Sequence, residues 1–335
     1  MSASRLSLAL DAPGALPPEG RILVIASGAA GDLAPLAKER CVVVEGMRPA
    51  HDALTAAGWS VVPEIAEATG DFAAALVLVP RARAAARAAV AEAARRVRPG
   101  GAIWIDGQKT DGIDALLKDI KARTAPSAPI AKAHGRIFRI DAGPGFGDWR
   151  AADILPAPGF VTRPGVFSAE KVDAGSALLA AALPARLPAR IADLGAGWGW
   201  LSAAILGHAG VAEVHLVEAD HLALSCARRN ITDPRARFHW ADATRFRPAR
   251  ALDAVVMNPP FHAGRAADPA LGSAFIASAA AMLAPSGRLW MVANRHLPYE
   301  AVLARHFREQ AEIGGNGGFK LLSAARPLPT PRPKG

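Results

Sequence analysis

The stretch IADLGAGWGWL, residues 191–201, decides the fold of this chain. Its start has the composition of a buried strand, and the run 201–206 after it has that of a helix. Gly195, Gly197 and Gly199 lie between the two. Glycine has no Cβ, so a strand, a glycine turn and a helix N-terminus in this order let the backbone approach a ligand closely. The stretch alone is typical of many nucleotide-binding α/β folds.

Two further apolar stretches make the prediction more specific. Residues 214–220 read VHLVEAD, a strand that ends near Glu218, whose carboxylate is placed to bind a ribose diol. Residues 253–262 read DAVVMNPPFH, a strand that ends in an Asn-Pro-Pro-aromatic tetrad. In this order and spacing, the three stretches resemble the class I S-adenosylmethionine-dependent methyltransferases.

Length and composition limit the possible classes of protein. A chain of 335 residues predicts two domains of roughly 150 residues each. The net charge is +9, with the larger share in the second half, which suits a polyanionic partner such as RNA. No apolar run reaches the ~20 residues that a membrane span needs. Cys41 and Cys226 stand far apart in apolar segments, which predicts buried free thiols in a reducing cytoplasm and no metal site.

The first half reads as a degenerate copy of the second. Residues 96–105, RVRPGGAIWI, parallel residues 282–291, MLAPSGRLWM: a helix end, a Pro-x-Gly turn, and a strand with tryptophan at the same offset. Predicted helices at 82–96 and 272–283 complete a βα alternation, and hence a mainly parallel sheet, in each half.

The two copies differ in the residues that would carry chemistry. The first half has no three-glycine turn, and at the place of the Asn-Pro-Pro motif Val79 precedes the proline. We therefore expect a domain that kept its fold and lost its cofactor. Glu45 ends a strand as Glu218 does, and we interpret it as a solvated carboxylate rather than a functional one. Lys109 is either an RNA contact or part of an ordinary polar loop.

The predicted domain boundaries follow the glycine and proline content. We expect a degenerate domain over 1–150, a linker over 151–163, a catalytic domain over 164–326 and a disordered, proline-rich tail over 327–335. An amphipathic helix is predicted from Asp173 to Ala182. In such methyltransferases a short helix and loop just before the first strand often form a lid over the cofactor.

The predicted cofactor site spans all three strand ends. Asp193 is expected to organise the glycine turn and to accept a hydrogen bond from the cofactor's amino group, with a helix cap as the alternative. Asp242 is expected to accept from the adenine amine, again with a cap as the alternative. The full predicted set is Asp193, Gly195, Ala196, Gly197, Gly199, Glu218, Ala219, Asp242, Ala243 and Asn258.

The Asn-Pro-Pro-Phe tetrad predicts the reaction. The lone pair of an exocyclic amine is delocalised into the base, so the amine is a poor nucleophile. The oxygens of Asn258 and of the Pro259 carbonyl can accept the two amine hydrogens and aim the lone pair at the methyl group. Phe261 can stack on the flipped base. We expect Asn258, Pro259 and Phe261 to be catalytic, with no separate general base.

The residue after the tetrad, His262, narrows the family. The motif NPPFH at 258–262 resembles the bacterial ribosomal RNA guanine-N2 methyltransferases. So do PGVFS at 164–168, DAGSALL at 173–179, VANRHLPY at 292–299 and GGFK at 317–320. Trp198 and Trp200 depart from the family, because less bulky residues often hold these turn positions.

The resemblance implies a fold, a substrate and partners. It implies two tandem Rossmann-like class I methyltransferase domains with mainly parallel seven-stranded sheets, of which the N-terminal one is degenerate. It also implies that only the second domain binds S-adenosylmethionine, and it points to the 16S small-subunit enzyme within the family. The expected protein is a cytoplasmic monomer, with no membrane or metal partner, that acts on ribosomal RNA in the 30S subunit or its precursor. The expected substrate-binding residues are Phe167, Pro260, Phe261 and His262.

Other functions remain open at this point. A sister enzyme that methylates 23S RNA shares most of the motifs. A protein or small-molecule N-methyltransferase would share the cofactor site, and a Rossmann dehydrogenase would share the glycines but leave the Asn-Pro-Pro motif without a task. A non-catalytic ribosome-assembly factor would predict an eroded glycine turn, whereas residues 195–199 keep it intact.

Overall fold

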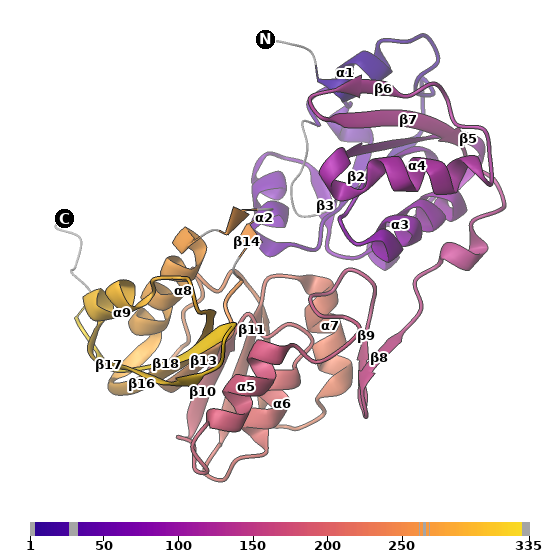
Figure 1. Ribbon diagram of the computed structural model, residues 1–335. Coiled ribbons are helices and arrows are strands. Elements are labelled where there is room, and N and C mark those ends of the chain that lie inside the picture. The colour runs from indigo at the N-terminus through magenta and orange to yellow at the C-terminus, as the bar shows by residue number, and fades with distance from the viewer. Residues whose placement is uncertain (1–3, 27–32, 261, 264–265, 268, 330–335) are drawn as a thin grey trace. The chain divides into compact units, whose positions relative to one another are not determined.

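The computed structural model describes residues 4–26, 33–260, 262–263, 266–267 and 269–329. It divides into two compact α/β units: Met1–Ile154 with Arg163–Gly165, and Leu155–Thr162 with Val166–Gly335. Each unit holds one seven-stranded sheet flanked by helices (Figure 1). The predicted pair of α/β domains is therefore confirmed.

The first sheet has the strand order β3-β2-β1-β4-β5-β7-β6. Its strands pair in parallel except for the pairs that involve β7. The strands are β1 (Arg21–Ile25), β2 (Cys41–Val44), β3 (Ser60–Val62), β4 (Phe72–Leu78), β5 (Val97–Gln108), β6 (Ile130–Lys132) and β7 (Gly135–Asp141). The helices of this unit are α1 (Arg5–Leu10), α2 (Arg48–Ala56), α3 (Arg83–Arg96) and α4 (Ile113–Lys121).

The second sheet repeats this topology in the order β12-β11-β10-β13-β16-β18-β17. Only the pairs that involve β18 are antiparallel. The strands are β10 (Arg190–Leu194), β11 (Glu213–Glu218), β12 (Ala236–Trp240), β13 (Leu252–Met257), β16 (Leu283–Asn294), β17 (Phe307–Gly315) and β18 (Phe319–Pro327). The helices are α5 (Ala174–Ala182), α6 (Trp200–Leu206), α7 (His221–Asn230), α8 (Pro269–Met282) and α9 (Glu300–His306).

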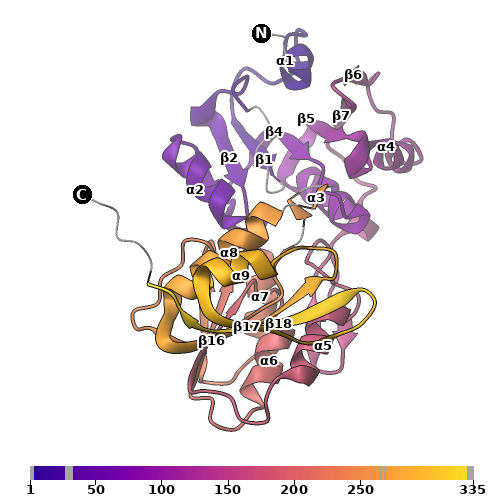
Figure 2. The ribbon, with the colours of Figure 1, turned by 60° about the vertical axis from the view of Figure 1, so that its left-hand side comes forward.

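Helices cover both faces of the second sheet, which explains why its strands read as nearly continuous apolar runs. In β13, Ala254 and Val256 pack towards α5, α6 and α7, whereas Val255 and Met257 pack towards α8 and α9. Figure 2 shows α8 and α9 side by side next to this sheet. The two faces hold two separate apolar cores. The polar residues of the predicted site lie at the strand ends, outside these cores.

The sheet register confirms the internal repeat. Trp104 of β5 lies opposite Leu76 of β4, and Trp290 of β16 lies opposite Val256 of β13. Both long strands also have a register shift near their starts, where the predicted Pro-x-Gly turns fall. The tryptophan offset in the sequence therefore reports equivalent places in two sheets of the same topology.

The segment predicted as a linker over 151–163 contains regular structure. Strands β8 (Ile154–Ala157) and β9 (Phe160–Thr162) form a two-stranded sheet. The side chain of Asn230, at the end of α7, holds β9 in place: its Oδ1 accepts from Val161 N–H at 2.8 Å, and its Nδ2 donates to the carbonyls of Val161 and Trp198. Most of this segment therefore groups with the second unit.

The predicted tail over 327–329 is also part of the fold. Pro327 ends β18, and the backbone N–H of Leu328 donates to the carbonyl of His306 at 2.8 Å. The rest of the predicted tail, 330–335, lies outside the described residues. Within the described part of the chain, no helix is long and apolar enough to span a membrane.

Candidate active site

The carboxyl ends of three neighbouring strands bring the predicted site residues together, except for Asp242 and Ala243, which follow β12. Strand β10 ends just before the glycine turn, β11 ends at Glu218, and β13 ends just before Asn258. Strand β10 pairs in parallel with both of the others, so the three ends lie at one edge of the sheet. This edge is where open α/β sheets bind their ligands.

The glycine turn has a left-handed backbone at each glycine. The φ angles of Gly195, Gly197 and Gly199 are +76°, +55° and +89°. A Cβ on Gly199 would lie 2.9 Å from Cδ1 of Ile231 and 3.2 Å from Cβ of Ala227 in α7, so helix packing leaves little room for a side chain there. A Cβ on Gly197 would meet no described atom within 4 Å. The space beside Gly197 is therefore open to a ligand.

Strand β11 holds the glycine turn in place. The carbonyl of Val217 accepts from the N–H groups of Gly195 and Ala196, at 2.9 and 3.2 Å. Glu218 Oε2 accepts from Gly197 N–H at 2.7 Å. We expected Asp193 to organise this turn, but the N–H groups of its first three residues donate to Val217 and Glu218.

Asp193 is bound instead to the helix that follows the turn. Its carboxylate is 1% exposed, and Oδ2 accepts from the Ser202 hydroxyl of α6 at 2.6 Å. Its Oδ1 has no hydrogen-bond partner among the described residues. Burial raises the pKa of this carboxyl group to about 7. A buried oxygen without a partner is costly, so Oδ1 is ready to accept from a ligand donor.

Glu218 is a second carboxyl group at this edge whose pKa is raised by burial. Its Oε1 accepts from the backbone N–H of Asp220 at 2.8 Å, so each carboxylate oxygen already holds one backbone N–H. Each oxygen keeps a further lone pair for a ligand hydroxyl. Burial raises the pKa of Glu218 to about 7.

Asp242 lies just beyond the end of β12. Its Oδ1 accepts from both the N–H and the hydroxyl of Thr244, at 2.8 and 2.6 Å. These bonds close a turn rather than cap a helix. Ala219 and Ala243, also predicted to bind cofactor, have structural contacts. The Ala219 carbonyl accepts from Trp240 Nε1, and the Ala243 side chain is buried in the apolar core.

Asn258 is fixed by two residues from another part of the chain. Its Nδ2 donates to Asp173 Oδ2 at 2.8 Å and to the Ser176 hydroxyl at 2.9 Å. Asp173 is the N-cap of α5, where the same Oδ2 accepts from Ser176 N–H at 2.8 Å. Of the two prolines that follow, Pro259 is buried and Pro260 is exposed.

The end of the tetrad is only partly described. Phe261 lies outside the described residues. His262 begins the short strand β14 (His262–Ala263), which pairs with β15 (Ala266–Ala267). The position of the His262 side chain also lies outside what the structure describes.

An open pocket joins the glycine turn to Asn258. It encloses about 430 Å³ of empty space, part of it open to solvent. Phe167, predicted to bind substrate, is 66% exposed at this pocket, and its carbonyl accepts from Trp198 Nε1 at 3.2 Å. The lining residues are Phe167, Ser168, Asp173, Ser176, Asp193, Gly195, Ala196, Gly197, Trp198, Trp200, Leu201 and Asn258.

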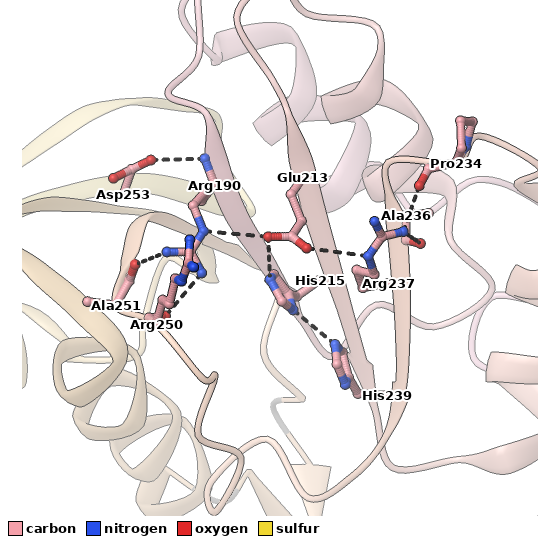
Figure 3. Close-up of polar contacts among 10 residues, drawn as sticks. All are labelled: Arg190, Glu213, His215, Pro234, Ala236, Arg237, His239, Arg250, Ala251 and Asp253. Carbon is pink, nitrogen blue, oxygen red and sulfur yellow. Dashed lines mark hydrogen bonds and ion pairs between the residues drawn. The ribbon is translucent and has the colours of Figure 1, made fainter.

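A second polar cluster lies on the same sheet but outside this pocket. Glu213 accepts from Arg190 and pairs with Arg237, and His215 stands beside it (Figure 3). Nδ1 of His215 and Nε2 of His239 are 2.9 Å apart. Burial lowers the pKa of both rings, that of His239 to about 4. None of these residues lines the pocket, and we interpret the cluster as structural.

No group of histidine, cysteine and acidic residues within the described ranges has the arrangement of a metal site. The side chains of Cys41 and Cys226 are both buried, as their apolar surroundings in the sequence predicted.

Comparison of the whole sequence with known proteins identifies the family of this chain. The family model described as methyltransferase small domain matches residues 158–323. The ribosomal RNA small subunit methyltransferase C of Pseudomonas aeruginosa (strain LESB58) is 32% identical over 269 residues, which cover 77% of this chain and 80% of the relative. This chain belongs to the ribosomal RNA small subunit methyltransferase C family.

A solved structure agrees with this family in both domains. The T. thermophilus 16S rRNA N2 guanine-1207 methyltransferase, in complex with AdoMet and guanosine, is 27% identical, with a TM-score of 0.77. The match covers 93% of this chain and 89% of that one. The ribosomal RNA large subunit methyltransferase G of Ectopseudomonas mendocina is 32% identical, but the match covers 63% of this chain and 53% of that relative.

Two residues of the pocket had no role assigned from the sequence. Asp173 and Ser176 were noted only as part of a motif, yet both contact Asn258. The available signal was an Asp-x-x-Ser pattern at a predicted helix start, which is also the signature of an ordinary helix cap. Their contact with a residue more than 80 positions away follows only from the fold.

Proposed function

We propose that this protein transfers a methyl group from S-adenosylmethionine to the exocyclic N2 amine of a guanine in 16S ribosomal RNA. The observation that carries the proposal is the place of Asn258, in the wall of the same pocket as the glycine turn. The T. thermophilus relative is described as acting on N2 of guanine 1207 of 16S rRNA, so the equivalent nucleotide is the first target to test.

The pocket, together with Glu218 and Asp242 at the ends of the two strands beyond it, fits S-adenosylmethionine. Asp193 offers a partnerless, buried carboxylate oxygen for the amino group, and Glu218 offers a carboxylate for the ribose hydroxyls. The open space beside Gly197 accommodates the methionine part, and Asp242 would accept from the adenine amine. When bound, the cofactor supplies an electrophilic methyl group on a positively charged sulfur.

The chain's own contribution to the reaction is positioning. Both amide hydrogens of Asn258 are directed at Asp173 and Ser176, which leaves Oδ1 to accept a hydrogen of the target amine. The Pro259 carbonyl would accept the second hydrogen. Together they aim the nitrogen lone pair along the line of displacement. After transfer the amine loses its proton to water, so no general base is required.

The acceptor base needs apolar surfaces as well. Phe167 is exposed at the pocket, and Phe261 follows the two prolines in the sequence. We propose that one or both stack on a guanine flipped out of the RNA. Pro260 and His262 are further proposed substrate contacts.

We propose that RNA binding involves both domains. The net charge of +9 suits a polyanionic substrate. The first domain would position RNA without binding cofactor. The proposed working form is a cytoplasmic monomer that acts on the 30S subunit or its precursor.

The test is transfer of radiolabelled methyl groups to naked 16S RNA, naked 23S RNA and 30S particles, with the product nucleoside identified by mass spectrometry. N2-methylguanine in 16S RNA or 30S particles is the expected result. Labelling confined to 23S RNA would favour the large-subunit alternative, for which the similarity to methyltransferase G is the supporting observation. Labelling of protein alone would overturn an RNA substrate.

RNA affinity supplies a second test. Phosphate contacts release counterions, so affinity should fall steeply between about 50 and 200 mM salt. An affinity that stays constant over this range would contradict the proposed polyanionic substrate.

A further inference from the structure

We infer that Asp173 and Ser176 are positioning residues that set the orientation of the Asn258 amide, and so fix an oxygen rather than an NH2 group towards the acceptor. The inference deepens the proposed function and rests on the role of Asn258 in it. Neither residue needs to touch the RNA base or the cofactor for this task.

The hydrogen bonds show how the orientation is fixed. Asn258 Nδ2 has two hydrogens and two acceptors, Asp173 Oδ2 at 2.8 Å and the Ser176 hydroxyl at 2.9 Å. Rotating the amide by half a turn would place Oδ1 against the Asp173 carboxylate. An ionised carboxylate only accepts hydrogen bonds, so two oxygens would then face each other. Asp173 therefore excludes the orientation that Ser176 alone would tolerate.

The orientation matters because the acceptor is an amine. An amine approaches with hydrogens, which an amide oxygen can accept and an NH2 group cannot. A rotated Asn258 would present two more hydrogens to it and would turn the lone pair away from the methyl group. Asp173 and Ser176 thus act on turnover, whereas the cofactor-binding carboxylates Asp193 and Glu218 act on affinity.

Asp173 also caps α5, and the two roles can be separated by substitution. Serine caps helices about as well as aspartate, but its single short hydroxyl lacks the reach to hold both Ser176 N–H and the Asn258 amide. Asp173→Ser should keep the cap and lose the orientation. Asp173→Asn keeps an acceptor oxygen that can hold both bonds, and serves as the conservative control.

The decisive experiment is a double-mutant cycle in single-turnover methyl transfer to the RNA substrate that wild type modifies. We expect Asp173→Ser to lower the transfer rate by roughly 10-fold, with RNA and cofactor affinity and the melting temperature unchanged. Asp173→Asn should stay within about threefold of wild type. In an Asn258→Ala background, Asp173→Ser and Ser176→Ala should have no further effect, because they act only through Asn258. Full multiplicative losses in that background would overturn the inference.

A spectroscopic measurement tests the same inference without any acceptor. The two Nδ2 proton signals of Asn258, assigned by their loss in Asn258→Ala, should be resolved and protected from exchange in the full-length protein. They should shift and exchange faster in Asp173→Ser combined with Ser176→Ala. Unchanged signals in this variant would overturn the inference even if the proposed RNA substrate is correct. A shift together with inactive wild type would instead contradict the proposed function alone.

Discussion

The two domains share a sheet but differ at the positions that carry chemistry. The sheet registers place Val24 of the first domain at the position of Asp193, and Leu78 at that of Asn258. Glu45, by contrast, keeps an acidic side chain at the position of Glu218. Apolar residues thus replace both groups that would face the cofactor or the acceptor.

Glu45 and Glu218 make the same hydrogen bond at the end of their strands, which gives a structural reason for a glutamate in both domains. Glu45 Oε1 accepts from Met47 N–H at 2.7 Å, just as Glu218 Oε1 accepts from Asp220 N–H at 2.8 Å. Glu45 is 1% exposed, so the sequence-based interpretation of a solvated carboxylate is wrong. The glutamate at this position makes a strand-end hydrogen bond in both domains, and only in the second do we propose that it also binds the cofactor.

The largest difference between the domains should appear at Asn258. We expect Asn258→Ala to lower kcat by ~10²-fold or more while cofactor affinity stays nearly intact, because the lost contact acts mainly in the transition state. Leu78→Ala is the matched substitution in the first domain. It should cost about 2–5 kcal/mol of stability and leave kcat of the folded protein unchanged. Single-turnover transfer and chemical denaturation measure the two effects. Equal rates for Asn258→Ala and wild type would make the tetrad a structural turn.

The next effect concerns the paired glutamates. Glu218→Gln should weaken S-adenosylmethionine binding by about 10- to 100-fold, the scale of one charge-assisted hydrogen bond. Glu45→Gln makes the same chemical change in the first domain and should leave cofactor affinity unaltered. Isothermal titration calorimetry on both full-length variants measures this. A comparable loss of affinity in Glu45→Gln would show that the first domain also binds cofactor.

Cofactor binding should depend on pH because burial raises the pKa of both Asp193 and Glu218 to about 7. Ligand donors bind the ionised carboxylates, so the dissociation constant should rise as the pH falls below 7, by up to about tenfold per pH unit for each proton. In the unliganded protein, the stability of the fold changes with pH in the opposite direction to cofactor affinity. The native pKa values exceed the unfolded ones, so these groups stabilise the fold at low pH, and this stability is lost as the pH rises towards 7.

Calorimetry in two buffers of different ionisation enthalpy should detect the protons released on binding near pH 6.5. Glu218→Gln should remove part of this release. A dissociation constant that is flat from pH 5.5 to 8 would mean that neither carboxylate changes ionisation on binding.

The smallest expected effect comes from the histidine pair. The sheet registers place Val42 and Val62 of the first domain at the positions of His215 and His239. Because burial lowers the pKa of both rings, they favour folding above the ordinary histidine pKa and lose that contribution as the pH falls towards 4. Replacing both histidines with valine should raise stability at pH 5 by roughly 1 kcal/mol relative to the change at pH 8, after allowance for ring exposure. Thermal melts at the two pH values test this, and equal shifts would contradict it.

The sequence predicts the duplicated fold and the strand-end residues because both leave local marks. The repeated Trp104 and Trp290 offsets, the three glycines and the Asn-Pro-Pro motif are short patterns tied to backbone geometry. The equivalence of Leu78 with Asn258 was less visible, because the sequence suggested Val79 and Pro80 for that place. Strand pairing sets it, and pairing depends on hydrogen bonds between segments far apart in the chain.

The remaining gaps have the same physical origin. Asp173 reaches Asn258 across 85 positions, and Asn230 reaches Val161 across 69. Neither contact follows from a helical or strand periodicity, so the sequence alone does not indicate it. Glycine and proline in 151–163 indicated an irregular linker, because turn residues mark a short hairpin and a loop alike.

The anchoring of β9 by Asn230 determines where this protein can be shortened. The Asn230 side chain connects both Val161 and the glycine-turn residue Trp198 to α7. A catalytic fragment that begins at residue 164 would therefore lack β9, which shares this asparagine with the wall of the pocket. A fragment that begins at Ile154 keeps the whole β8–β9 hairpin. Expression trials and limited proteolysis should therefore find the stable amino-terminal limit of the catalytic half before the hairpin and not after it.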